Sequence, residues 1–287
     1  MIGIRKGKKD KNNYKTSLKT ALFISLINLS DIHLEKDVFL IPLSFRKLGY
    51  KILYIVGSNN VKEVIDDIDL IELKKLNFIK LIISILQNLG KVKPQIIFMY
   101  PLWRYQLFIN LVLIIYKIIS LKKFVVILKL DTDGNLDSIR RNKALVKAFF
   151  FASIISTDIT IVESNDAKDR LLSYYNKFMR DILVKKIYVM PNGLTTELIL
   201  KYKEFKTKYA QFKSNKILVN SRVTETKGLY ELILALSKIK DEIKDWVIHI
   251  VGPIEDENYY LKLMSAIDHL GLKDKIIFLG KLKYEDL

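Results

Sequence analysis

Apolar residues along this chain follow two alternating patterns, one typical of buried β-strands and the other of amphipathic α-helices. Short apolar runs end in glycine or polar residues, and the longer segments between them repeat apolar residues at spacings of three and four. Strands that alternate with helices predict a mostly parallel sheet covered on both faces. The predicted strands span residues 21–27, 51–56, 69–73, 95–100, 124–130, 158–162, 187–190, 217–219, 246–251 and 275–279.

Helical patterns fill most of the segments between these strands. Gly49, Gly90 and Gly271 follow three of the patterns, and glycine often ends a helix because it adopts left-handed backbone conformations. Pro42 is expected to kink or start the first helix, because it lacks a backbone N–H. The predicted helices span residues 37–48, 78–89, 103–120, 138–151, 166–175, 229–239 and 259–270.

The order of these elements predicts an α/β fold with two Rossmann-like domains. Residues 1–18 are expected to form a basic tail, residues 19–193 the first domain and residues 194–287 the second. The second domain has three predicted strands, whereas a doubly wound fold normally contains two such halves. The last residues, 284–287, resemble the first turn of a further helix, so we expect the second domain to be incomplete and the chain to be truncated.

The composition narrows the choice of partner and compartment. The 287 residues carry a net charge of +17, which favours anionic partners such as phosphorylated substrates or acidic lipids. The sequence shows no recognisable nucleic-acid-binding motif, so nucleic acid is not expected as a partner. The absence of cysteine excludes disulfides and thiolate metal sites, and it fits a reducing, cytoplasmic compartment.

The most apolar segment is too short to predict a membrane span. Residues 107–121 contain Asn110 and Lys117 and fall short of the roughly 20 apolar residues that a spanning helix needs. Residues 1–19 are basic and polar and lack the apolar core of a signal peptide. A buried helix is therefore favoured for residues 107–121, with a peripheral helix on the inner face of the membrane as the alternative.

The segment 216–228 combines several features of a phosphate-binding loop. Its sequence, KILVNSRVTETKG, leads from an apolar strand to Gly228, after which a helix is predicted. A helix N-terminus at the carboxyl edge of a sheet attracts anions through its unpaired backbone N–H groups. Arg222 and Lys227 add two cations, which favours a diphosphate; the alternative is that both are ordinary solvated surface residues.

In its context, this loop resembles the donor-binding domain of the GT-B glycosyltransferases, specifically the retaining family 4. The loop is followed by Ile-Val-Gly-Pro at 250–253, Leu-Gly-Leu at 270–272 and Ile-Ile-Phe-Leu-Gly at 276–280, in the order that the family shows. Upstream, residues 190–193 read Met-Pro-Asn-Gly and are similar to the family's junction between its two domains. The resemblance extends over most of the chain but is specific mainly from residue 186 onward.

The resemblance implies a transferase of polysaccharide biosynthesis that moves a sugar from a nucleotide-diphosphate-sugar to a glycan or lipid-linked acceptor. It also implies retention of configuration and no metal or other cofactor. Residues of the family that match Arg222, Lys227 and Gly228 hold the donor diphosphate, and Asn192 and Gly193 would lie at the hinge and cleft between the domains. A pair of glutamates that engages the donor follows in the family. The sequence contains no such segment, so we expect impaired activity.

Four polar residues that follow predicted strands are candidates for the acceptor side, because parallel strands end at one edge of the sheet. His33 is a candidate for orienting the acceptor, although the family's glycine-rich loop is missing there. Asp131 is the candidate catalytic residue, and Asp133 is placed beside it in the acceptor site. Ser164 matches a serine near the family's domain cleft, although capping the next helix is the simpler role.

Two other functions remain alternatives. Asp131-Thr132-Asp133 is formally an Asp-x-Asp motif, which binds a divalent ion in the other large glycosyltransferase fold and would indicate a metal-dependent transferase. The incomplete second domain also fits a non-catalytic protein that binds nucleotides or anionic surfaces.

Overall fold

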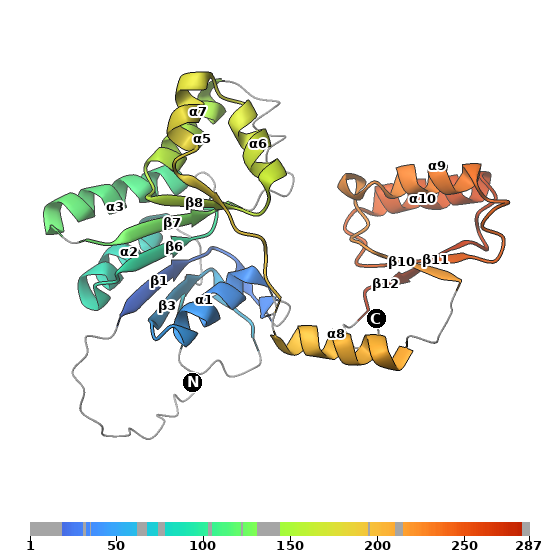
Figure 1. Cartoon of the computed structure of the whole chain (residues 1–287), viewed down its shortest axis with the longest axis horizontal. Coiled ribbons are helices and arrows are strands. Elements are labelled where there is room, and N and C mark those ends of the chain that lie inside the picture. Colours follow the sequence, from blue (N-terminus) through green and yellow to red (C-terminus); the bar gives the residue numbers. More distant parts are fainter. Residues whose placement is uncertain are drawn as a thin grey trace. The chain divides into compact units, whose positions relative to one another are not determined.

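The computed structural model describes residues 19–30, 33–34, 36–61, 68–73, 78–102, 105–121, 123–130, 144–194, 196–209 and 215–282. The chain divides into two compact units, Met1–Ile199 and Leu200–Leu287 (Figure 1). Each unit has its own parallel sheet and its own hydrophobic core. Helix α8, Thr196–Tyr209, begins in the first unit and ends in the second.

The first unit is built on a seven-stranded sheet with the order β5-β3-β1-β6-β7-β8-β9. All neighbouring strands in it are parallel, so their carboxyl ends lie at one edge. A separate pair of short strands, β2 and β4, forms beside it. The strands are β1 Thr20–Ile24, β2 Asn28–Leu29, β3 Lys51–Val56, β4 Ser58–Asn59, β5 Ile68–Glu72, β6 Ile96–Met99, β7 Val125–Lys129, β8 Ile159–Val162 and β9 Ile187–Val189.

Helices cover both faces of this sheet, which confirms the predicted α/β architecture. On one face, Phe39 of α1 packs into a core that includes the aromatic residues Phe23, Tyr54 and Phe98. The opposite face packs against the other described helices of the unit through a larger aliphatic core. The helices are α1 Asp37–Lys47, α2 Phe78–Val92, α3 Gln106–Ser120, α5 Ala144–Ile155, α6 Asn165–Ser173 and α7 Lys177–Leu183.

The second unit contains a three-stranded parallel sheet, as expected from its sequence. Its strands are β10 Lys216–Asn220, β11 Val247–Val251 and β12 Ile276–Gly280, and its helices are α9 Leu229–Lys238 and α10 Glu257–His269. Ile248 and Ile250 of the central strand are buried in a core shared with α9 and α10, and both helices lie on the same side of the sheet (Figure 1). Residues alternate between sheet faces, and Leu218 and Ile277, in register with each other through β11, are exposed on the other face.

Three expectations about helices are corrected by the structure. No helix was predicted between residues 175 and 229, but the structure forms α7, Lys177–Leu183, and α8, Thr196–Tyr209, in this segment. Gly90 does not end α2, which continues to Val92 and stops where Lys93 adopts a left-handed conformation with φ 48°. Pro94 follows directly, and the residue before a proline is disfavoured in a helix.

Pro42 lies inside α1 and neither starts nor ends it. Proline cannot donate the backbone hydrogen bond that the carbonyl of Val38 would normally accept within the helix. The structure supplies another donor, because the hydroxyl of the buried Tyr54 donates to that carbonyl at 2.9 Å. The strand β3 therefore satisfies the carbonyl that the proline leaves free.

Candidate functional site

The carboxyl edge of the first sheet gathers a group of charged and polar side chains. Lys129 is the last residue of β7, Glu163 directly follows β8, and Asn192 lies in the segment after β9. Asp37 is the first residue of α1, which follows β1 in the chain. These four residues form what we call the Lys129 cluster.

The buried ammonium of Lys129 joins two carboxylates. Its Nζ atom lies 2.5 Å from Oδ2 of Asp37 and 2.8 Å from Oε1 of Glu163, and the Lys129 side chain is only 1% exposed. Asn192 extends the chain of contacts, because its Nδ2 donates to the same Glu163 oxygen at 2.9 Å. A buried charge needs such partners, since an unpaired ammonium in a protein interior is costly.

The cluster shifts the pKa of both the lysine and the glutamate. Burial alone would lower the pKa of Lys129, but the hydrogen bonds and charges of Asp37 and Glu163 outweigh it and raise the pKa. Burial likewise favours the neutral form of Glu163, but the hydrogen bonds from Lys129 and Asn192 and the lysine charge hold the pKa of Glu163 below its usual value. Both groups are therefore charged at neutral pH.

Two buried tyrosines hold the start of α1 in place behind the cluster. The hydroxyl of Tyr100 donates to the backbone carbonyl of Asp37 at 3.0 Å, next to the Tyr54 contact with Val38. Burial raises the pKa of Tyr100 well above its usual value, so the hydroxyl keeps the proton that it donates. The Asp37 carboxylate is thus positioned from both its backbone and its side chain.

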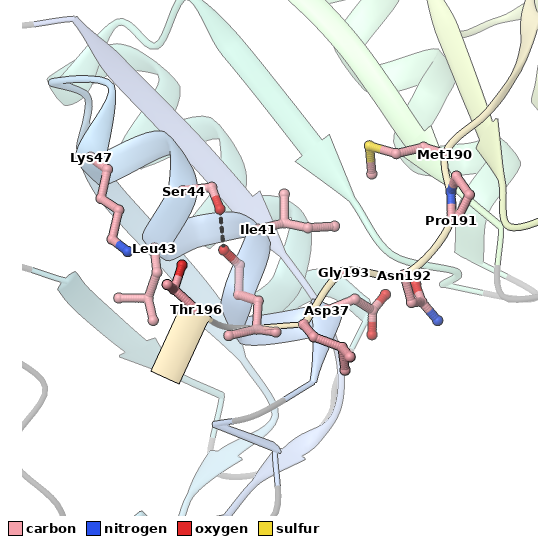
Figure 2. A pocket seen from close by; sticks show the side chains of 12 residues that line it. Asp37, Ile41, Leu43, Ser44, Lys47, Met190, Pro191, Asn192, Gly193 and Thr196 are labelled. Carbon is pink, nitrogen blue, oxygen red and sulfur yellow. Dashed lines mark hydrogen bonds between the residues drawn. The ribbon is translucent and has the colours of Figure 1, made fainter. Parts of the chain in front are cut away.

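A pocket of about 510 Å³ adjoins the cluster (Figure 2). It lies between α1, which contributes Ser44 and Lys47, and the segment Met190 to Gly193 after β9. Asp37 and Asn192 belong both to the pocket wall and to the Lys129 cluster. A carboxylate and an amide in one wall offer acceptors and donors to the hydroxyl groups of a sugar-like ligand.

Of the predicted acceptor and cleft residues that the structure describes, only two lie at this pocket. Asn192 and Gly193 line the pocket. The Ser164 hydroxyl accepts from the backbone N–H of Ala167 at 3.1 Å and therefore caps α6. Asp131 and Asp133 lie outside the described residues, so their catalytic and acceptor roles stay predictions.

His33 is engaged by its own loop. Its Nδ1 accepts from the backbone N–H of Ser30 at 3.2 Å and lies 2.9 Å from the Ser30 hydroxyl, which leaves the proton of the neutral ring on Nε2. Burial and the charge of Lys36 lower the pKa of His33, against the effect of the Ser30 contact. The ring is not among the residues that line the pocket of Figure 2.

Lys129 and Glu163 stand at the ends of two predicted strands, and Asp37 begins a predicted helix, but no contact among the three was predicted from the sequence. Their pairing depends on the register of β7 against β8 and on the docking of α1, neither of which a short motif records. The available signal was a lysine within the otherwise apolar run of residues 124–130, because a strand buried on both faces tolerates a cation only when it is paired.

The predicted diphosphate loop lies at the carboxyl edge of the second sheet. Arg222 follows β10, Lys227 ends the short 3-10 helix Glu225–Lys227, and Gly228 immediately precedes α9 with φ 68°. This left-handed conformation explains the glycine at that position. The strand, loop and helix therefore occur in the predicted order, with Arg222 and Lys227 on the loop before the helix N-terminus.

A neighbouring loop already contacts the arginine. Arg222 Nη1 lies 2.9 Å from Oε2 of Glu255, which belongs to the loop after β11. The two loops are held together by a β-bridge between Val223 and Ile254. Gly252 permits this approach, because its φ is 152° and a Cβ atom there would collide with the backbone of Ser221. Sequence reasoning did not foresee the Glu255 partner.

Within the parts of the chain that the structure describes, no three His, Asp or Glu side chains are grouped so that they could hold a metal ion. The Asp131-Thr132-Asp133 motif is not among those residues, so the metal-dependent alternative remains a hypothesis.

Comparisons with known proteins give a family match for the second unit and structural matches for most of the chain. A family model described as glycosyl transferases group 1 matches residues 201–287, the segment that contains Arg222, Lys227 and Gly228. A search of curated proteins finds no match.

Solved structures match over almost the whole chain. A glycosyltransferase from Rickettsia africae ESF-5 has a TM-score of 0.63 at 20% identity, covering 92% of this chain and 69% of that one. Anabaena Alr3699/HepE in complex with UDP and glucose has a TM-score of 0.59 at 14% identity, covering 92% and 70%. The chain has a GT-B fold.

A third match is WaaG, a glycosyltransferase involved in lipopolysaccharide biosynthesis, with a TM-score of 0.55 at 12% identity over 92% of this chain and 70% of that one. At these identities the structures establish the fold, and the family model adds support for a role in glycosyl transfer. The expected GT-B architecture is confirmed.

Proposed function

We propose that this protein transfers a glycosyl group from a nucleotide-diphosphate-sugar to a glycan or lipid-linked acceptor, with retention and without a metal ion. The observation that carries the proposal is the loop Arg222 to Gly228. It lies at the carboxyl edge of a parallel sheet, before a helix N-terminus, and within the segment matched by the glycosyltransferase family model.

The donor half of the proposal rests on phosphate chemistry. A departing nucleoside diphosphate develops negative charge, which fixed cations and backbone N–H groups stabilise by electrostatics. Arg222 is the only arginine among residues 200–287, which contain fifteen lysines, and it stands at the strand end where its planar fork is suited to phosphate oxygens. Lys227 and the start of α9 would complete the site.

The acceptor half is assigned to the pocket of the first unit. Asp37 and Asn192 would bind acceptor hydroxyl groups there, and Lys129 and Glu163 would keep these two side chains in position. The catalytic role is proposed for Asp131, which is the second residue after β7 in the sequence.

The proposal is tested by incubating the whole chain with a panel of nucleotide-sugars and measuring release of the nucleoside diphosphate, with and without glycan and lipid-linked acceptors. We expect one donor to give acceptor-dependent release, and NMR of the anomeric proton to show that the product keeps the donor's configuration. Nucleotide binding without any transfer would support the non-catalytic alternative, and an inverted product would contradict retention.

A further inference from the structure

The outer surface of α2 and α3 in the first unit has an unusual composition. The two helices meet at their N-terminal ends, where the ring of Phe78 stacks on Tyr105 at 5.2 Å and contacts Phe108 edge-on at 5.7 Å. Both helices bury their inner residues in the same aliphatic core.

Their outer residues are also apolar, although these side chains are exposed. On α3 the exposed apolar residues recur at helical spacing, so the outward face of this helix is as apolar as its buried face. Ile118 is 67% exposed and Ile119 is 77% exposed. Solvated helices normally place charged residues there. We call this surface the apolar face; it comprises Ile79, Ile83, Leu86, Phe108, Leu111, Ile115, Ile118, Ile119 and Leu121.

The charged residues of the sequence segment that contains α2 and α3 all have one sign. Between Leu73 and Leu130 the sequence contains ten Lys and Arg residues and no Asp or Glu, although the whole chain has 31 acidic residues. Lys80, Lys91 and Lys123 of this segment are exposed. Asp158 of a neighbouring loop pairs with Lys117 at 3.2 Å, but α2 and α3 carry no acidic residue of their own. An exposed apolar surface on helices whose charged residues are all cations is complementary to a lipid surface with anionic headgroups.

We infer that the apolar face docks on an anionic membrane surface, with α2 and α3 lying along it. Isoleucine, leucine and phenylalanine side chains would enter the boundary between headgroups and acyl chains, and the lysines would reach the phosphates. None of the described helices combines the length and hydropathy needed to cross a membrane, so contact from one side is the geometry that these helices allow. This inference does not depend on the proposed transferase activity.

A second copy of the chain fits the apolar face less well. In a symmetric dimer the same patch meets itself, which would bring the lysines of one copy against those of the other. No acidic residue of the segment Leu73 to Leu130 could compensate them. The exposed side chains are aliphatic apart from Phe108, whereas protein interfaces favour tyrosine, tryptophan and arginine.

The inference is tested by sedimenting the whole chain with vesicles of phosphatidylcholine alone and of phosphatidylcholine mixed with phosphatidylglycerol. We expect binding to the anionic vesicles that weakens with added salt. Replacing Ile115 and Ile118 together by Glu should lower the partition coefficient at least about tenfold, because two apolar side chains no longer enter the lipid. The matched control replaces Leu261 and Met264 by Glu, because these two residues are exposed on α10 with the same spacing. This control should bind the vesicles like the parent chain.

Thermal melts followed by circular dichroism check that both double variants fold like the parent. Exchanging Lys80, Lys91 and Lys123 together for Gln should lower binding to the anionic vesicles without changing the melting temperature. Equal vesicle binding by the Ile115/Ile118 variant and the parent would overturn the inference. So would a lipid-free dimer that this variant converts to a monomer, because the apolar face would then be a protein interface.

Discussion

The Nζ atom of Lys129 lies 2.5 Å from Oδ2 of Asp37, so the last residue of β7 is tied to the first residue of α1. The same ammonium holds Glu163, and through it Asn192, at the next strand ends. One buried cation thus fixes two opposite parts of a pocket wall: the start of a helix and the segment after the last strand. The pocket that we assign to the acceptor depends on this ion pair for its shape.

Replacing Lys129 by Met should lower the free energy of unfolding of the first unit by about 3–5 kcal/mol. The reason is that two partly buried carboxylates would be left facing each other without their cation. Lys51→Met provides the matched control. It also removes one lysine from an ion pair, with Asp69 at 2.9 Å, but both side chains there are more than half exposed. Lys51→Met should lower the free energy of unfolding by about 1 kcal/mol or less.

Denaturant unfolding of both variants, followed by circular dichroism, measures the difference. A further variant that also carries Asp37→Asn and Glu163→Gln should recover much of the loss, because no buried charge then lacks a partner. If Lys129→Met costs no more than Lys51→Met, the cluster does not stabilise the fold as described.

The lowered pKa of Glu163 makes stability depend on pH in the acid range. Because the folded state holds this carboxyl below its usual pKa of 4.5, the unfolded chain binds the proton more readily. The stabilisation is therefore complete above pH 4.5 and disappears as the pH falls through the lower folded value. Glu163→Gln keeps hydrogen-bonding groups at this position but cannot titrate.

Melting temperatures of the parent and the Glu163→Gln variant between about pH 6 and about pH 3 test this. The parent should lose more stability than the variant over this range, because it alone loses the Glu163 contribution. Parallel pH profiles for the two proteins would show that the Glu163 contacts do not affect its protonation.

Elements with a clear buried stripe were predictable from the sequence, and elements without one were not. The strand Lys51–Val56 was predicted at its observed bounds, because all but its first residue are buried. Helix α8 was missed because its apolar residues, among them Leu200, Tyr202 and Phe205, are exposed and leave no periodic signal. Helix α7 is only seven residues long and buries Leu183 alone, too little for a repeat.

One part of the candidate site was predictable from the sequence and the other part was not. The loop with Arg222, Lys227 and Gly228 is contiguous in the sequence, so its residue types and their order could be predicted. The Lys129 cluster joins residues that are far apart in the chain, and only strand register and helix docking bring them together. The partner of Arg222 was missed for the same reason, since Glu255 belongs to the next loop.

The donor site predicts a specific loss when its arginine is removed. Arg222→Ala should weaken nucleoside diphosphate binding by roughly 1.5–3 kcal/mol, the range for hydrogen bonds to charged groups. Lys273→Ala is the matched control, because it removes an exposed cation paired with Asp268 just before β12, at the opposite edge of the sheet. Titration calorimetry should show parent-like affinity for the control; equal affinity in all three proteins would contradict the assignment.

The ion pair between Arg222 and Glu255 predicts that Glu255 weakens the binding of a diphosphate to Arg222. A diphosphate must compete with the Glu255 carboxylate for the guanidinium, and it is also repelled by that negative charge. Glu255→Gln should therefore tighten nucleoside diphosphate binding by about two- to fivefold, in line with the small free energy of exposed ion pairs. The gain should vanish in the Arg222→Ala background. A gain that persists without Arg222 would place the diphosphate elsewhere.

Metal dependence separates the proposed mechanism from its nearest alternative. Fixed cations at Arg222 and Lys227 would neutralise the donor diphosphate without a divalent ion, so chelation with EDTA should leave nucleoside diphosphate affinity unchanged. A metal held by Asp131 and Asp133 would instead bridge the diphosphate, as Mg²⁺ does in sites that bind it through one or two carboxylates and phosphate oxygens.

The two mechanisms then differ in three linked measurements on the same protein. If EDTA abolishes nucleotide binding, manganese restores it, and Asp131→Asn with Asp133→Asn removes the restoration, the metal-dependent transferase is correct. If affinity is insensitive to EDTA and to both substitutions but falls in Arg222→Ala, the metal-free donor site is supported. In that case Asp131→Asn should still reduce glycosyl transfer, because its assigned role is in the reaction and not in holding the donor.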